Sequence, residues 1–182
     1  STQPQPPKPP TITNSYRMNV SGRFEWRLAL LVLVTAAVIR GGVLGLTPGA
    51  LSKDVDGYRQ LAENLHTAGV FGWKTSHGGP QVVRPTAFRP PLYPLLLACA
   101  CNEDGLSFVW AAALHWAIGM ASVGLILCVS RSYLSGRWSC VAAMLVACDP
   151  ILLHQSTQVM TESLAALLAV MGLAGCTWLE RR

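Results

Sequence analysis

The stretch RLALLVLVTAAVIRGGVLGL, which runs from Arg27 to Leu46, decides the class of fold. Its only charged residues are Arg27 and Arg40, and it has the roughly 20 residues that a helix needs to cross a bilayer. A secretory signal peptide shares the basic flank and the apolar centre. A long polar tail precedes this stretch, however, and more apolar segments follow it, so we expect an uncleaved membrane anchor.

The composition of the whole chain is typical of a membrane protein. Its 182 residues are 51% hydrophobic and 13% charged, whereas soluble domains carry about 25% charged residues. The apolar residues come in long blocks, which indicates membrane helices and not one large soluble core. The net charge is +5, but the arginines are scattered and many border apolar blocks. This pattern excludes the clustered basic face of a nucleic-acid-binding protein.

Further apolar segments predict a helical bundle. We expect spans at 27–46, 106–129, 138–153 and 161–179. The proline-rich residues 1–24 predict an extended, disordered cytoplasmic tail, and residues 25–182 form the transmembrane part. The stretch LYPLLLACA after Pro91 is too short to cross alone, so it is expected to be re-entrant or interfacial. The predicted fold class is all-α: a polytopic transmembrane helix bundle with an extracytoplasmic loop that carries interfacial helices.

Arginines near the ends of these segments predict the orientation. They form three groups, before the first span, between the second and third, and after the fourth: Arg17, Arg23, Arg27, Arg131, Arg137, Arg181 and Arg182. Four spans place all three groups on one side, which the positive-inside rule makes cytoplasmic. The polar loop from 47 to 105 and the turn at 149–160 then face outward. We therefore expect an integral protein of the cytoplasmic membrane with its N-terminus inside.

The outer loop contains KDVDGYRQLAENL, from Lys53 to Leu65. Tyr58 and the apolar residues three, four and seven positions later share one helical face, which predicts a helix lying along the membrane surface. Asp54 precedes Tyr58 by about one turn, near the helix N-terminus, where the macrodipole stabilises an anion; Asp56 points elsewhere. The alternative is that both aspartates simply cap and solvate the start of the helix.

Three motifs follow one another in a characteristic order. They are D-x-x-x-Y-x-x-L-A-x-x-L from Asp54 to Leu65, PTAFRPPLYPLLLA from Pro85 to Ala98, and DPILLHQSTQVMTESL from Asp149 to Leu164. After one N-terminal span, this set resembles the start of a lipid-dependent membrane glycosyltransferase of the C superfamily, among them the bacterial protein-mannosyltransferase-like and aminoarabinose-transferase-like enzymes. The resemblance implies that a sugar moves from a polyprenyl-phosphate donor to an acceptor hydroxyl of a lipid, glycan or protein. The transfer occurs at the outer face of the membrane and inverts the anomeric carbon.

The resemblance also implies roles for single residues. Asp54 matches the catalytic carboxylate of the first outer loop, which would remove the proton of the acceptor hydroxyl. Asp56 and Tyr58 belong to the same active-site helix. Glu162 matches the glutamate of a recurrent Thr-Glu pair and would orient the acceptor or hold Arg89. The alternative for Glu162 is a plain carboxylate at a helix start.

Three arginines are candidates for the lipid phosphate. Arg89 matches a position where similar enzymes carry a basic residue near the phosphate, and a guanidinium suits bidentate phosphate contact. Arg84 is a second candidate. The alternative for both is a solvated or snorkelling side chain. Arg40 lies inside the first span, where a charge is costly and often functional, although near the outer end it can also snorkel.

Two other classes of function stay open. In a transporter or channel-type subunit, Arg40 and Glu162 would line a path; the third class is a non-catalytic membrane fragment. The six cysteines and four histidines lack the spacing of a metal site, so no metal site is predicted, no cofactor is certain, and dependence on a divalent metal is left open. The similar enzymes are much longer, so we expect these 182 residues to be part of a longer enzyme and to be doubtfully active alone.

Overall fold

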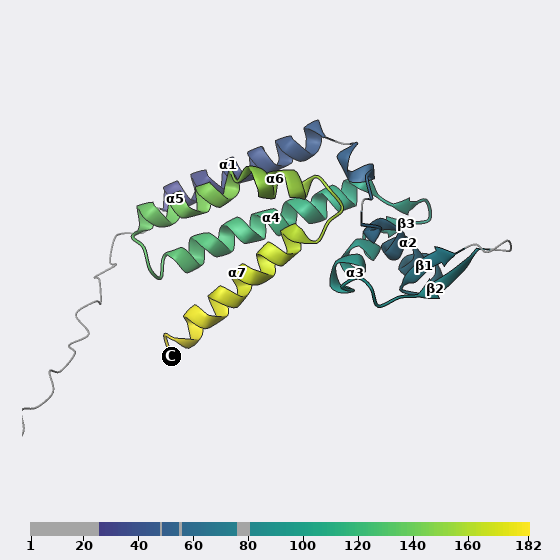
Figure 1. Cartoon of the computed structure of the whole chain (residues 1–182). Coiled ribbons are helices and arrows are strands. Elements are labelled where there is room, and N and C mark those ends of the chain that lie inside the picture. The colour runs from purple at the N-terminus through teal and green to yellow at the C-terminus, as the bar shows by residue number, and fades with distance from the viewer. Residues whose placement is uncertain (1–25, 48, 55, 76–80) are drawn as a thin grey trace, which may run out of the picture.

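The computed structural model describes residues 26–47, 49–54, 56–75 and 81–182, and the predicted tail at 1–24 lies outside these ranges. The described chain is mostly helical, with seven α-helices, one short 3-10 helix and four short strands. The long helices lie side by side, and the strands gather with the shorter helices at one end of them (Figure 1). The prediction of a mostly helical protein is confirmed.

Three helices are long and apolar enough to cross a membrane: α1 (Trp26–Leu46), α4 (Phe108–Ser130) and α7 (Glu162–Leu179). They coincide to within two residues with three of the segments predicted from the apolar blocks. Large apolar side chains on these helices face outward, and Val38, for example, is 68% exposed. A continuous apolar surface of this kind is what a helix presents to lipid.

The segment predicted as one continuous third span, 138–153, is broken. Helix α5 (Gly136–Ala147) and helix α6 (Pro150–Ser156) meet at a bend of 49°, and only if they count as one span does the chain have four. Proline takes the first position of α6, where its missing N–H costs nothing and its ring disfavours helix in the residue before it. Asp149 then accepts hydrogen bonds from the backbone N–H groups of Ile151 and Leu152, both at 2.9 Å.

Small residues let the long helices approach closely. The core between α1, α4 and α5 contains Ala36, Val123, Ala143 and Ala147, all fully buried. Small side chains at such crossings bring helix backbones together, which is the main source of packing energy when lipid replaces water around the bundle. We call the four helices α1, α4, α5 and α7, together with α6, the bundle.

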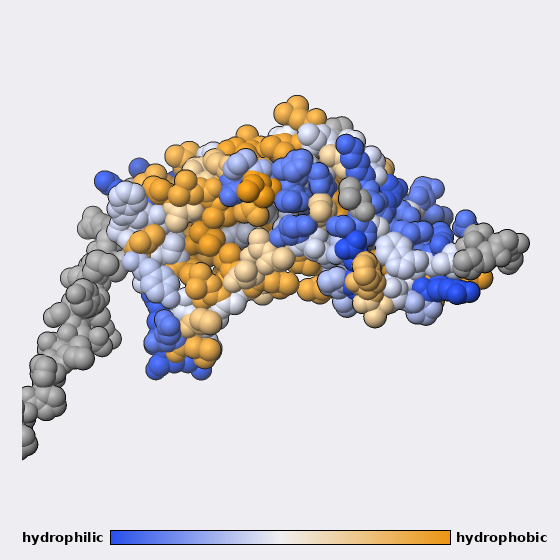
Figure 2. All heavy atoms as spheres, in the orientation of Figure 1, coloured by the Kyte–Doolittle hydropathy of each residue, from blue (hydrophilic) through white to orange (hydrophobic). Residues whose placement is uncertain are grey.

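The remaining elements form what we call the cap, residues 50–107 (Figure 1). It comprises η1 (Ala50–Ser52), α2 (Tyr58–Ala68), β1 (Gly72–Thr75), β2 (Val82–Pro85), α3 (Leu92–Ala98), β3 (Cys101–Asn102) and β4 (Gly105–Leu106). Helix α2 and helix α3 occupy the two segments in which short helices were predicted. Hydrophilic residues dominate the cap end of the surface, whereas apolar residues dominate over the bundle (Figure 2).

The sequence-based prediction missed the two small hairpins of the cap. Strands β1 and β2 pair antiparallel with Trp73 opposite Arg84, and β3 and β4 pair antiparallel in the turn before α4. Gly57 has the left-handed φ of 74°, and a Cβ there would lie 2.2 Å from the ring of Trp73. Glycine at this position therefore lets the first hairpin pack directly against the start of α2.

A second core joins the cap to the bundle. Tyr58, Leu61 and Leu97 of the cap pack in one buried cluster with Ile118 of α4 and Val159, which precedes α7. Burial of this apolar surface fixes the short helices against the ends of the long ones. The cap is therefore a packed unit, and its polar groups have defined positions.

Candidate functional site

Asp54 is held at the start of α2 by the backbone. One carboxylate oxygen accepts the N–H of Arg59 and the other accepts the N–H of Gln60, both at 3.1 Å. These N–H groups belong to the first turn of α2 and have no partner within the helix. The capping role that was the alternative for Asp54 is thus present in the structure, and it fixes the carboxylate at the positive end of the helix dipole.

Asp56 and Arg89 form an ion pair. The Nη2 group of Arg89 lies 2.9 Å from Oδ1 of Asp56, and about a quarter of each side chain is exposed. The guanidinium also lies over the rings of Tyr58 and Phe88, with 5.4 and 5.2 Å to their centroids. Asp56 precedes α2, which begins at Tyr58, so it belongs to the loop before the predicted active-site helix.

Tyr93 of α3 is buried and contacts the start of α2. Its ring packs edge-on against the ring of Tyr58, with centroids 5.3 Å apart. Burial raises the pKa of its hydroxyl well above the usual range; a backbone hydrogen bond with Met160 acts in the opposite direction, and the negative charges of Asp54 and Glu162 raise it further. Two acidic groups more than 100 positions apart in the sequence therefore act on one phenol.

Glu162 is the first residue of α7 and is exposed. Among the residues that the structure describes, none forms a hydrogen bond or an ion pair with its carboxylate. Arg89, one of its two expected partners, is taken by Asp56 instead. The carboxylate of Glu162 is thus available to a ligand at the cap end of the bundle.

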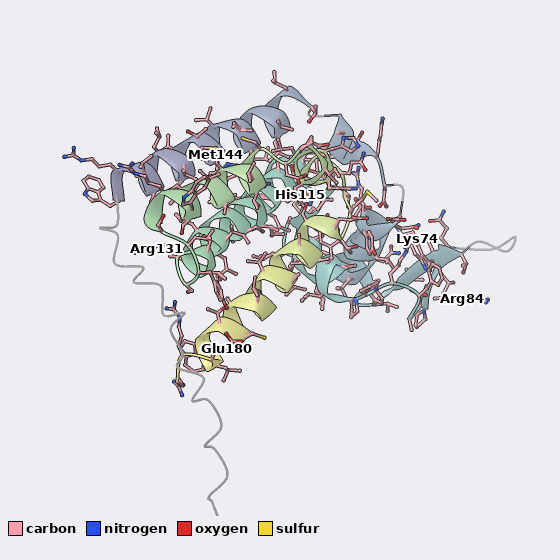
Figure 3. The ribbon with its side chains drawn as sticks, turned by 60° about the vertical axis from the view of Figure 1, so that its left-hand side comes forward. Lys74, Arg84, His115, Arg131, Met144 and Glu180 are labelled. Carbon is pink, nitrogen blue, oxygen red and sulfur yellow. The ribbon has the colours of Figure 1, made fainter. Side chains whose placement is uncertain are left out.

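Arg84 does not join this cluster. It lies on β2, is exposed, and points outward from the hairpin at the edge of the cap (Figure 3). Lys74 of the neighbouring strand is exposed in the same region (Figure 3). Both are solvated side chains, which was the alternative stated for Arg84, and the structure gives neither of them a contact with the predicted carboxylates.

Arg40 lies elsewhere as well. Only 3% of this residue is exposed, and its Nη2 group donates to the carbonyl of Val146 at 3.1 Å, in the last turn of α5. A Cβ on Gly119 would come within 2.5 Å of the guanidinium, so glycine makes room for it between the helices. A cation near the C-terminal carbonyls of a helix stabilises them. Arg40 is therefore part of the bundle, and it does not snorkel to the surface.

Sequence reasoning missed a buried chain of hydrogen bonds behind the site. The hydroxyl of Tyr93 lies 2.7 Å from Nε2 of His115, and Nδ1 of His115 lies 2.6 Å from the carbonyl of Ser156. Each of the three residues is only 1% exposed. They come from α3, α4 and α6. One sequence signal pointed to the chain: a histidine in the middle of an apolar helix needs a polar partner, because unpaired polar groups are costly there.

Within the described ranges, no group of three or more His, Cys, Asp or Glu side chains is placed to hold a metal ion. A hollow of about 290 Å³ lies between α3 and α4 and is lined by Leu96, Cys99, Ala100, Trp110, Ala113 and Leu114. It has no charged side chain, so it suits an apolar group and not the chemistry of the carboxylates. It opens on the same helix α3 that carries Tyr93.

No family model matches the chain, and no curated protein or solved structure matches it either. The resemblance to the C-superfamily glycosyltransferases therefore rests on the three sequence motifs. What the structure adds is a cap with Asp54, Asp56, Tyr58 and Arg89 at one end of the apolar helices. Glu162 lies at the cap end of α7, and Arg84 and Arg40 have separate locations.

Proposed function

We propose that the chain is part of a membrane glycosyltransferase that uses a polyprenyl-phosphate sugar at the outer membrane surface. The observation that carries the proposal is the arrangement around Tyr93. Asp54 caps the helix that begins with Tyr58, and the ring of Tyr58 packs edge-on against that of Tyr93. The guanidinium of the Asp56–Arg89 pair lies over the ring of Tyr58, and the negative charges of Asp54 and Glu162 both raise the pKa of the Tyr93 hydroxyl. Carboxylates to activate an acceptor thus stand beside a cation for a phosphate, at the polar end of a lipid-facing bundle.

In the proposed reaction, the acceptor oxygen attacks the anomeric carbon as the bond from that carbon to the phosphate oxygen breaks. The acceptor proton passes to Asp54, and the phosphate leaves with the bonding electrons. A carboxylate has about four lone-pair sites. The two backbone N–H groups occupy one site on each oxygen of Asp54, so the capping role leaves a site on each for a proton. Capping in addition fixes the base in one orientation, which general base catalysis needs.

Arg89 is suited to the leaving phosphate. Its ion pair with Asp56 uses Nη2, and about a quarter of its side chain is exposed, whereas its Nε is buried. A guanidinium carries five N–H donors, so a phosphate can bind while Asp56 keeps its contact. The rings of Tyr58 and Phe88 hold the guanidinium plane in place, and a fixed cation stabilises developing negative charge better than a mobile one.

The positions of the basic residues support an outward-facing cap. The start of α1, the turn between α4 and α5, and the end of α7 all lie at the end of the bundle opposite the cap (Figure 1). Arg131 marks that end, and Lys74 and Arg84 mark the cap (Figure 3). If the arginine-flanked end is cytoplasmic, as the positive-inside rule predicts, then the carboxylates face outward and meet a lipid-linked sugar at the membrane surface.

A transporter is the competing proposal, and the broken α5–α6 pair is the feature that favours it, since broken helices form ion and substrate sites in transporters. Here the chain itself occupies both helix ends. Asp149 accepts from the start of α6, and Arg40 donates to the last turn of α5. A helix end already bound by a side chain has little affinity left for a transported ion, so the enzyme is favoured.

The proposal is tested with Asp54→Asn in the natural protein that contains this chain, purified in lipid nanodiscs. Asparagine is a good capping residue, although its single amide oxygen keeps only one of the two capping bonds of Asp54. It cannot take a proton, so transfer from polyprenyl-phosphate sugar should fall by about 10²–10⁴. Donor binding and the helix content measured by circular dichroism should be retained. Asp56→Asn is the matched control and should retain more transfer. Equal transfer by Asp54→Asn and the wild type would reject Asp54 as the base.

A further inference from the structure

The Tyr93–His115–Ser156 chain runs from the cap into the bundle. Tyr93 belongs to α3, His115 to the second turn of α4, and Ser156 ends α6. Its two hydrogen bonds, at 2.7 and 2.6 Å, join residues that are 22 and 41 positions apart. The three groups are almost completely buried, so neither bond is exchanged with water, and both act at full strength in the low local dielectric.

The partners fix the direction of both bonds. The carbonyl of Ser156 can only accept, so Nδ1 of His115 carries a proton. No carboxylate forms a hydrogen bond with this ring in the described part of the chain, and a buried imidazolium without a counter-charge is costly. The ring is therefore neutral, Nε2 is an acceptor, and the hydroxyl of Tyr93 donates to it.

The second end of the chain leads to Glu162. Ser156 is followed by a short turn, closed by backbone bonds from Thr157 to His154 and from Met160 to Gln158, and then by α7, which begins with Glu162. The carboxylate itself has no hydrogen-bond partner within the described residues. Its location is thus set by the backbone of this turn, which His115 anchors through the carbonyl of Ser156.

We propose that Tyr93 and His115 are positioning residues that set the distance between Asp54 and Glu162. They do so by tying α3, which contacts the start of α2 through Tyr93 and Tyr58, to the end of α6, which precedes the turn to Glu162. Tyr58, four residues after Asp54, packs edge-on against Tyr93, so the phenol meets both sides of the site. The pKa of the Tyr93 hydroxyl, raised mainly by burial, agrees with a hydroxyl that stays protonated and keeps donating. The proposal rests on the proposed function for its effect on transfer, but its structural part stands alone.

Tyr93→Phe removes one oxygen atom and tests the proposal. The matched control is Tyr133→Phe, which removes the hydroxyl that lies 3.0 Å from Oγ1 of Thr177 at the opposite end of the bundle. Each variant loses a side-chain hydrogen bond between distant segments, from Tyr93 to His115 of α4 and from Tyr133, in the turn after α4, to Thr177 of α7. Only the first changes the link between the carboxylates. We expect kcat for transfer to fall by up to about 100-fold in Tyr93→Phe, since small misplacements of reacting groups cost this much. The donor dissociation constant should be unchanged, and Tyr133→Phe should keep the wild-type kcat.

A second measurement does not depend on transfer. Lys53 and Ala165 are exposed neighbours of the two carboxylates, so each can carry a spin label. Double electron–electron resonance in nanodiscs then measures the distance between the two labels, which follows the distance between Asp54 and Glu162. Tyr93→Phe should broaden the distance distribution, and Tyr133→Phe should leave it as in the wild type. A distribution equally narrow in all three proteins overturns the positioning proposal. If the wild-type protein shows no transfer, the proposed function is rejected. If the distance distribution nevertheless broadens in Tyr93→Phe alone, the positioning role is kept. Equal loss of kcat in both variants also overturns the positioning proposal.

Discussion

Arg40 of the bundle and Arg89 of the cap are held by different means. In the bundle, Arg40 donates to a backbone carbonyl, that of Val146, which cannot move without unwinding α5. In the cap, Arg89 pairs with a side chain, that of Asp56, and both stay about a quarter exposed. A ligand anion can therefore share Arg89, whereas Arg40 is committed to the fold.

The two arginines also differ in what surrounds their guanidinium groups. Arg40 fits against Gly119, where no side chain could be accommodated without a shift, and Asp149 is near enough to act on its charge. Arg89 lies over the rings of Tyr58 and Phe88, and Phe88 is itself exposed. The comparison teaches that a charge in an apolar segment is not by itself a sign of a binding site. What matters is whether a ligand can reach the guanidinium: Arg40 is only 3% exposed, whereas about a quarter of the Arg89 side chain is exposed.

Removing Arg40 should have the largest effect on stability. Arg40→Ala empties a packed position in the bundle and leaves the carbonyl of Val146 without its donor, which should cost about 2–5 kcal/mol, as for other large-to-small core changes. Arg40→Met keeps most of the volume and removes the charge, so it should cost less. Urea unfolding in mild detergent, followed by circular dichroism, measures both. If Arg40→Ala unfolds at the same urea concentration as the wild type but loses donor binding, then Arg40 binds the ligand. The distinction between a structural Arg40 and a ligand-binding Arg89 would then be wrong.

Removing Arg89 should affect the ligand more than the fold. Arg89→Ala loses a charge-assisted contact worth about 1.5–3 kcal/mol, so the affinity for polyprenyl-phosphate sugar should fall by roughly 10-fold to 150-fold. Arg89→Lys should recover only part of it, because an ammonium keeps the charge and loses the planar fork. Acceptor affinity at saturating donor should not change.

Two exposed cations of the first hairpin provide controls for Arg89. Lys74→Ala and Arg84→Ala each remove one positive charge from the cap without touching the Asp56–Arg89 pair, so both should bind donor like the wild type. Binding is measured by isothermal titration in nanodiscs. An Arg84→Ala variant that loses affinity while Arg89→Ala keeps it would transfer the phosphate site to the hairpin.

The bundle was easier to predict from the sequence than the cap. Helices α1, α4 and α7 follow from unbroken apolar blocks, because in a membrane every backbone group must be paired within the segment. Pro150 also signalled the break after α5, since proline disfavours helix in the residue before it. What the sequence could not give was the angle of that break, because packing against α1 and α4 sets it.

The cap depends on contacts between distant positions. The pairing of Trp73 with Arg84 needs only four residues on each strand, too few for a clear alternating pattern, although the sequence Gly-Gly-Pro between the two strands was a usable signal. The Asp56–Arg89 pair spans 33 positions, and no local rule selects Asp56 over Glu162 as the partner. The sequence motifs directed attention to these segments, and long-range packing decided which side chains meet.

A pair of glycines tests how the cap is held. Gly57 and Gly69 both have left-handed φ angles, 74° and 66°, but only Gly57 has the ring of Trp73 against it. Gly69→Ala should cost about 1–2 kcal/mol, the usual penalty for this conformation. Gly57→Ala should cost about 1–3 kcal/mol more, because the new methyl group overpacks the hairpin. Hydrogen exchange of the β1–β2 amides should increase only in Gly57→Ala. Equal costs would mean that Trp73 does not hold the hairpin against α2.

The smallest perturbation tests the orientation on which the comparison depends. In a variant without the native cysteines, Lys74→Cys places a thiol on the exposed strand β1 of the cap, and Ser135→Cys places one in the exposed turn before α5. Neither residue belongs to a core, so both variants should fold and insert like the wild type.

With the cap outside, a membrane-impermeant maleimide should label Lys74→Cys in intact cells, or in spheroplasts if an outer barrier excludes it. Ser135→Cys should react only after lysis, because the turn lies at the arginine-flanked end. The reverse pattern would put Asp54 and Arg89 on the cytoplasmic side, where the predicted outward-facing donor could not reach them. Labelling of both thiols before lysis would show that the membrane does not separate the cap from the turn before α5.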